Sequence, residues 1–97
     1  MKSVFIVFNQ SHQDRVEYIL DMLEIKGFTL WGEVQGRGSV DGEPHRGTHT
    51  WPEMNVSILA VMDESKIDPL FEKLRTLNEL NREVGLRAFV WNIERNL

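Results

Sequence analysis

The strongest constraint on the fold is a strand–helix–strand pattern that occurs twice along the 97 residues. Runs rich in β-branched and aromatic residues predict the strands, and apolar residues at helical spacing predict the helices. In chain order, the predicted elements are a strand at 3–8, a helix at about 11–27, a strand at 28–34, a strand at 54–62, a helix from about 63 to 81 and a strand at 86–93.

Local signals define the predicted helix ends. Ser11, followed three residues later by Asp14, resembles a capping box, and Gly27 is placed to stop the first helix. His12 then falls in the first turn, where we expect it to be exposed. The second helix follows acidic and capping residues, and Pro69 fits only its first turn.

Two βαβ units of similar length predict an α+β, ferredoxin-like βαββαβ fold, with a four-stranded antiparallel sheet and both helices on one face. Two helices cover one face only, yet the strands at 3–8 and 86–93 and the end of 54–62 are apolar on both faces. The uncovered face should therefore be buried, most economically against another copy of the chain. The alternative is that the loop between the units folds back over it.

Length and charge narrow the class of protein. Ninety-seven residues suit one domain, 1–97, and 11 basic against 15 acidic residues give a net charge of −4, which offers no reason to expect nucleic acid binding. Cysteine is absent, which excludes thiolate chemistry. The apolar runs are too short to span a membrane and no leader precedes them, so we expect a cytoplasmic protein without direct membrane insertion.

A glycine-rich stretch suggests where function resides. Five of the seven glycines fall within 32–47, and residues 35–53 show no periodicity, which predicts a loop. Gly36-Arg37-Gly38 could bind an anion through backbone N–H groups and a guanidinium, although such a sequence more often only makes a turn. Neither a P-loop nor a Rossmann motif is present.

The same loop contains two histidines and a tryptophan. His45 and His49, with Glu43 or Glu53, form a reasonable ligand set for a divalent transition metal, whereas the simpler interpretation is two solvated histidines. Trp51 could anchor the return of the loop or contact a partner. No nucleophile motif or placed carboxylate pair supports catalysis, so we do not expect an enzyme.

The order of motifs around this loop resembles the PII superfamily of signalling proteins, over essentially the whole chain. The matching segments are Gly27-Phe28-Thr29, Glu33-Val34-Gln35-Gly36-Arg37-Gly38, Arg46-Gly47 and the strand from Met54 to Val61 that leads into Asp63-Glu64.

The resemblance implies a homotrimer whose sheets face inward, and a T-loop at about 35–53 that docks onto a membrane transporter or a regulated enzyme. It places small effectors in clefts between subunits near Gly36, Arg37 and Gly38. Arg46, Gly47 and Trp51 would belong to the partner-binding loop. The resemblance does not identify the effector, and a nucleotide and a divalent transition metal both remain candidates.

The chain also departs from the nitrogen-regulatory PII pattern. Its loop is shorter, and its only tyrosine, Tyr18, lies in the first predicted helix. Residues 80–87 stand where those proteins have a phosphate-binding B-loop motif, and the chain stops at Leu97 without their C-terminal basic segment. The sequence is also similar to the short-loop PII-like branch and to CutA relatives. The leading hypothesis is therefore a PII-like regulator, with a metal-binding CutA-like protein and a nucleotide or anion sensor as alternatives.

Overall fold

The computed structural model describes residues 1–37, 44–45, 54–81 and 85–97. Six strands, two α-helices and two short 3₁₀ turns make up this part of the chain. The strands are β1 (Lys2–Asn9), β2 (Phe28–Val34), β3 (Gly36–Arg37), β4 (Pro44–His45), β5 (Asn55–Met62) and β6 (Arg87–Asn92), and the helices are α1 (Gln13–Met22) and α2 (Ile67–Leu80).

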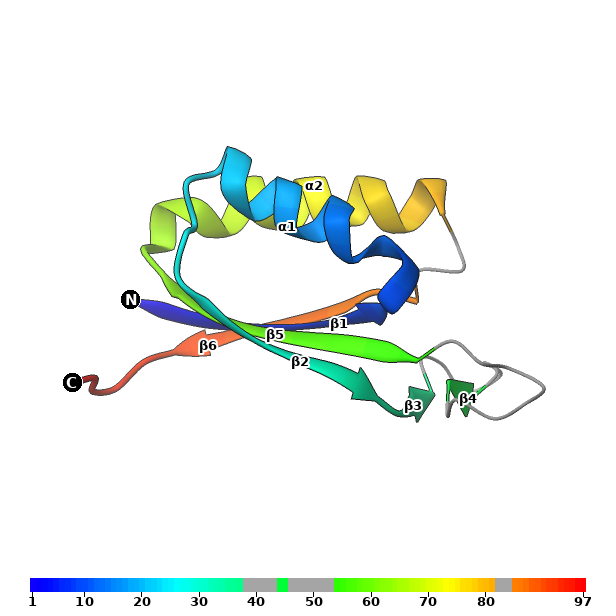
Figure 1. The fold of residues 1–97 in the computed structure, drawn as a ribbon. Coiled ribbons are helices and arrows are strands. Elements are labelled where there is room, and N and C mark those ends of the chain that lie inside the picture. Colours follow the sequence, from blue (N-terminus) through cyan, green and yellow to red (C-terminus); the bar gives the residue numbers. More distant parts are fainter. Residues whose placement is uncertain (38–43, 46–53, 82–84) are drawn as a thin grey trace.

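Four of the strands form one antiparallel sheet in the order β2-β5-β1-β6. The two central strands are β1 and β5, which pair from Lys2 opposite Met62 to Asn9 opposite Asn55. Both helices lie on the same side of this sheet, and no helix covers the other side in the described part of the chain (Figure 1). The predicted ferredoxin-like fold is confirmed.

The core lies between the sheet and the two helices. Alternate residues of β1 and β5 point toward the helices, and Val4, Ile6, Phe8 and Ile58 have no exposed surface. The other fully or nearly buried apolar residues are Val16, Ile19, Leu20, Ile25, Val56, Ala60, Met62, Leu70, Leu74, Leu77 and Leu86. The predicted apolar stripes of both helices therefore form the contact with the sheet.

The start of α1 differs from the prediction. Asn9, not Ser11, caps this region: its Oδ1 accepts hydrogen bonds from the backbone N and the Oγ of Ser11, both at 2.8 Å. A 3₁₀ turn (Gln10–His12) follows, and α1 begins only at Gln13. This extra turn directs His12 toward the interior, where it is buried, so the prediction of an exposed His12 is wrong.

The end of α1 also lies earlier than predicted. The helix stops at Met22, and Glu24, not Gly27, adopts the left-handed conformation, with φ 59°. The N–H of Ile25 donates to the carbonyl of Leu20 at 2.8 Å, and the N–H of Glu24 donates to that of Asp21 at 3.0 Å, which is a Schellman ending. Burial of Ile25 and Leu20 holds this ending in place without a glycine.

The second helix follows the prediction closely. Asp63 caps a 3₁₀ turn (Glu64–Lys66) by accepting a hydrogen bond from the backbone N of Ser65 at 2.9 Å, and α2 continues to Leu80. The pKa of Asp63 lies below its ordinary value because Ser65 hydrogen-bonds to its carboxylate, through the side chain first and the backbone second. Pro69 falls in the first turn of α2, as predicted.

Part of the predicted loop is ordered. The short strands β3 and β4 pair antiparallel, with Gly36 opposite His45 and Arg37 opposite Pro44. The prediction that 35–53 lacks regular structure is therefore wrong for these four residues, because backbone pairing forms a ribbon that leaves no periodic side-chain pattern in the sequence.

Candidate functional site

The side of the sheet opposite the helices is the first candidate surface, and we call it the open face. The register places three rows of side chains across its strands. The rows are Thr29–Leu59–Phe5–Phe89, Trp31–Ser57–Val7–Arg87 and Val61–Ser3–Trp91.

Large apolar side chains of the open face are accessible to solvent. Phe89 is 55% exposed, Trp91 49%, Trp31 46% and Val61 41%. The central serines, by contrast, are almost completely buried beside their larger neighbours, with Ser57 opposite Trp31 and Ser3 opposite Trp91. An apolar surface shared by all four strands is larger than the scattered apolar residues of an ordinary protein surface and is typical of an interface.

The strand that leads into the glycine-rich segment is bent. Between Trp31 and Val34, β2 advances by three residues while β5 advances only from Ser57 to Asn55, which is a β-bulge. Glu33 lies in this bulge with φ 56°, a left-handed conformation that a residue with a Cβ rarely adopts. The bulge redirects the chain into β3 and so positions Gly36 and Arg37 beyond the end of the main sheet, next to β4 (Figure 1).

The predicted site residues are only partly within the described structure. The backbones of Gly36 and Arg37 lie in β3, and that of His45 lies in β4, directly opposite Gly36. The ribbon thus brings one predicted effector-binding residue and one predicted metal ligand together. The remaining predicted residues, Gly38, Glu43, Arg46, Gly47, His49, Trp51 and Glu53, lie outside the described residues.

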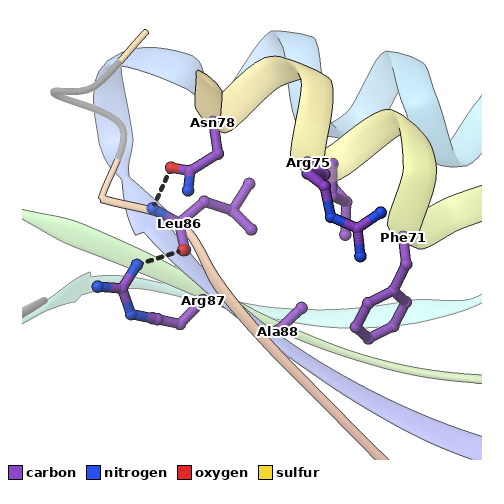
Figure 2. Close-up of a pocket in the computed structure, with 7 residues that line it drawn as sticks. Phe71, Arg75, Asn78, Leu86, Arg87 and Ala88 are labelled. Atoms are coloured by element: carbon purple, nitrogen blue, oxygen red, sulfur yellow. Dashed lines mark hydrogen bonds between the residues drawn. The ribbon is translucent and has the colours of Figure 1, made fainter. Parts of the chain in front are cut away.

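A pocket between α2 and the start of β6 was not predicted from the sequence (Figure 2). It has a volume of about 190 Å³. Phe71 and Arg75 extend from α2 at one end of it, while Asn78 and the first residues of β6 lie at the other (Figure 2). The lining residues are Phe71, Leu74, Arg75, Asn78, Leu86, Arg87 and Ala88.

Hydrogen bonds hold one end of this pocket. The Oδ1 of Asn78 accepts from the backbone N of Leu86 at 3.1 Å, which ties α2 to the entry of β6. The Nη1 of Arg87 donates to the carbonyl of Leu86 at 2.9 Å. A signal for this pocket does exist in the sequence, because Asn78 continues the i, i+4 row of Leu70 and Leu74 with a polar side chain, but only the topology places that row beside β6.

A metal site and a membrane-spanning helix can both be tested for on the described residues. Across residues 1–37, 44–45, 54–81 and 85–97, no three His, Asp or Glu side chains gather where they could hold a metal ion. In the same part of the chain, neither helix is long and apolar enough to span a bilayer.

Solved structures with the same fold come from PII-like proteins. CPII from Thiomonas intermedia K12, a nitrogen regulatory PII-like protein bound to ADP, AMP and bicarbonate, superposes with a TM-score of 0.74 at 22% identity, covering 97% of this chain and 88% of CPII. The apo form of CPII superposes with a TM-score of 0.73 at 22% identity, and the match covers 95% of this chain and 87% of CPII. A PII-like signalling protein from Thermus thermophilus superposes with a TM-score of 0.66 at 21% identity, and the match covers 95% of this chain and 84% of that protein.

At these identities the solved structures establish the fold alone, and a search of curated proteins finds no match. The family is established by sequence: the model of nitrogen regulatory protein P-II matches residues 1–96. The resemblance noted in the motifs around the glycine-rich segment is therefore confirmed over nearly the full chain. The chain belongs to the nitrogen regulatory protein P-II family.

Proposed function

We propose that this chain is a non-enzymatic, cytoplasmic PII-like regulator that works as a homotrimer, senses a small effector between subunits and acts on a partner protein. The match of the P-II family model to residues 1–96 carries this proposal. Residues 1–97 serve as a single domain, and the segment 35–53 serves as its T-loop.

The open face supports the assembly. Trp31, Val61, Phe89 and Trp91 are each between 41% and 55% exposed, although they belong to the same strands that form the core. Burial of an apolar surface stabilises association by roughly 25 cal/mol per Å² before the costs of assembly are subtracted. Three copies with their open faces turned inward would remove these side chains from water.

An adenine nucleotide is the effector we favour, with bicarbonate as a second ligand. CPII, which shares the fold, has been solved with ADP, AMP and bicarbonate. In this chain, Gly36, Arg37 and Gly38 are the proposed effector-binding residues, because glycine backbone N–H groups and a guanidinium both suit phosphate and carbonate oxygens. Pairing of β3 with β4 fixes the backbone of two of the three.

The T-loop segment is the proposed contact with a partner, which we expect to be a membrane transporter or a regulated enzyme. Arg46, Gly47 and Trp51 are its proposed partner-binding residues. Tryptophan and arginine are among the side chains most enriched in energetically important interface contacts, which supports this assignment.

The proposal predicts an assembly that nucleotides stabilise. Light scattering after gel filtration should give a mass about three times that of the 11.3 kDa chain. Thermal unfolding with ADP, AMP, ATP or bicarbonate should show a raised Tm for at least one nucleotide, since a ligand at 100 times its Kd stabilises the native state by about 2.7 kcal/mol. Arg37→Gln should reduce this shift.

Arg15→Gln is the matched control, because it makes the same chemical change on the exposed surface of α1 and should leave the nucleotide shift intact. A monomer at micromolar concentration would contradict the trimer. A trimer whose Tm is unchanged by every nucleotide at millimolar concentration would retain the assembly and contradict the proposed effector.

A further inference from the structure

We propose that the β-bulge in β2 is a conformational switch that sets the direction of the T-loop segment, 35–53. The end of β2 pairs with β5 in one of two registers, which are the bulged register of the structure and a regular register without the extra residue. This inference rests on the proposed role of 35–53 as the T-loop, and it adds the element that orients that segment. The switch itself lies within the described residues, between Trp31 and Val34.

The bulge decides which side chains reach the open face at the end of β2. It places two residues of β2, Gly32 and Glu33, opposite a single residue of β5, Val56. The next residue, Val34, then stands opposite Asn55. Asn55 belongs to the open face, because it lies two residues along β5 from a member of the rows described above. Cross-strand partners share a face, so the bulge brings Val34 to the open face.

The bulged register keeps a charge out of a buried row. Asn55 is 4% exposed, and its partner on β1, Asn9, is 2% exposed. Val34 completes this row and is half-buried, whereas Glu33 is exposed. In the regular register Glu33 would take the place opposite Asn55, and removal of its carboxylate from water there costs free energy. Exclusion of this charge therefore favours the bulge.

Backbone strain at the same residue opposes the bulged register. Glu33 has φ 56°, in the left-handed region that a residue with a Cβ rarely adopts. The regular register removes this strain, because every residue at the end of β2 is then extended. Each register thus carries one cost that the other lacks, and two such opposing costs allow both registers to be populated.

The end of β2 can change register without disturbing the rest of the sheet. β2 is an edge strand, paired in the described part of the chain with β5 alone. A Cβ added at Gly32 would meet no atom within 4 Å, so the backbone has open space beside it. Because β2 leads directly toward β3 (Figure 1), a shift of one residue turns the chain from Gln35 onward over to the opposite face.

Three substitutions at Glu33 test the switch, with cross-strand nuclear Overhauser contacts of the full chain as the report of register. Asn55 contacts Val34 in the bulged register and residue 33 in the regular one. Glu33→Gly removes the strain and should favour the bulge about tenfold. Glu33→Val favours an extended backbone and has no charge to bury, so the regular register should become the major one. Glu33→Gln removes the charge alone and should cause a smaller shift in the same direction.

The parent chain should populate the regular register as a minor state. ¹⁵N relaxation dispersion detects exchange on the microsecond to millisecond timescale and should show it at Glu33, Val34 and Gln35. Glu33→Gly should suppress this exchange, because it stabilises the major register. A parent chain without exchange at these three residues would have one register only, which would overturn the switch.

Thr29→Val is the matched control, because it introduces the same side chain at an exposed position in the regular part of β2. It should leave the register at Asn55 unchanged. Cooperative thermal unfolding of Glu33→Val, with a Tm near that of the parent chain, separates a change of register from a loss of the fold. A change of register in Thr29→Val as well would show that the response is not specific to the bulge.

Retention of the contact between Val34 and Asn55 in Glu33→Val would also overturn the inference, since neither strain nor charge at Glu33 would then control the register. None of these measurements needs a nucleotide or a partner. If nucleotides raise the Tm and Glu33→Val keeps the bulge, the proposed function stands and this inference fails. If the register changes and no nucleotide binds, the switch stands and the proposed effector fails.

Discussion

The two faces of the sheet come from the same strands but end in different environments. On the covered face, Val4, Ile6, Phe8 and Ile58 are fully buried under α1 and α2. On the open face, their sequence neighbours Phe5, Val7 and Leu59 are only half-buried, and the aromatic residues at both edges are more exposed still.

The difference shows that the two faces carry out different tasks. The covered face is complete within one chain and accounts for folding. In the described part of the chain, the open face carries side chains of core type with no helix over it, and Ser57 and Ser3 each lie next to one tryptophan. A chain that places this many large apolar residues on an exposed surface is built to associate, which is the physical basis for the proposed trimer.

The largest effect should come from opening a cavity in the covered face. Ile58→Ala should lower the free energy of unfolding by about 2–5 kcal/mol, because Ile58 is fully buried and its neighbours can collapse only partly. Urea unfolding monitored by circular dichroism measures this. Leu59→Ala, at the next residue on the same strand, should lower the free energy of unfolding less than Ile58→Ala does. Both variants are compared at a protein concentration low enough to dissociate the assembly. Equal losses would mean that the two faces contribute alike to the single chain.

A charge on the open face should break assembly and leave the fold intact. Phe89→Glu places an unpaired carboxylate in the proposed interface, which should raise the dissociation constant by two or more orders of magnitude, since such a charge costs about 3–5 kcal/mol when buried. Sedimentation velocity gives the assembly state. Tyr18→Glu is the matched control, because Tyr18 is 64% exposed on α1, a comparable exposure on the opposite side of the molecule. Dissociation by both variants would contradict a specific role of the open face.

The sequence predicted most of the difference between the two faces of the sheet, because side-chain alternation in strands and helical spacing are local patterns. The apolar residues assigned to each face of β1, β5 and β6 lie where the spacing placed them, and β2 has its predicted bounds. The helix ends were less predictable. Asn9 could act as the cap only once an additional 3₁₀ turn had formed, and Glu24 could take the left-handed position only because Ile25 is buried next to it.

The candidate sites were predictable only where one segment contains the whole pattern. The glycine-rich segment was identified from composition, but the pairing of Gly36 with His45 depends on a ribbon that no periodicity reveals. The pocket between α2 and β6 is lined by Leu74 and Leu86, which are separated in sequence and share a pocket only because β6 is an edge strand beside α2. Such sites depend on topology, which has to be known before the residues can be grouped.

The smallest expected effect concerns the helix layer that makes the covered face possible. The folded-state pKa of Asp63 is depressed by its hydrogen bonds to Ser65, so its charged form stabilises the native state above the ordinary carboxyl pKa, about pH 4. This contribution should be lost as the pH falls through the lower folded-state pKa. Asp63→Ala should therefore lower the Tm at pH 7 and differ less from the parent chain at pH 3.

Asp63→Asn separates the charge from the hydrogen bond, because asparagine caps a helix about as well as aspartate but does not titrate. It should retain most of the stability of the parent chain at pH 7, and the acid-dependent part of the Tm that Asp63 supplies should disappear. Thermal unfolding from pH 3 to pH 7 of the parent chain and both variants measures the effect. An Asp63→Asn variant with the full pH dependence of the parent chain would show that other carboxylates control the acid stability of the helix layer, and that this cap contributes through geometry alone.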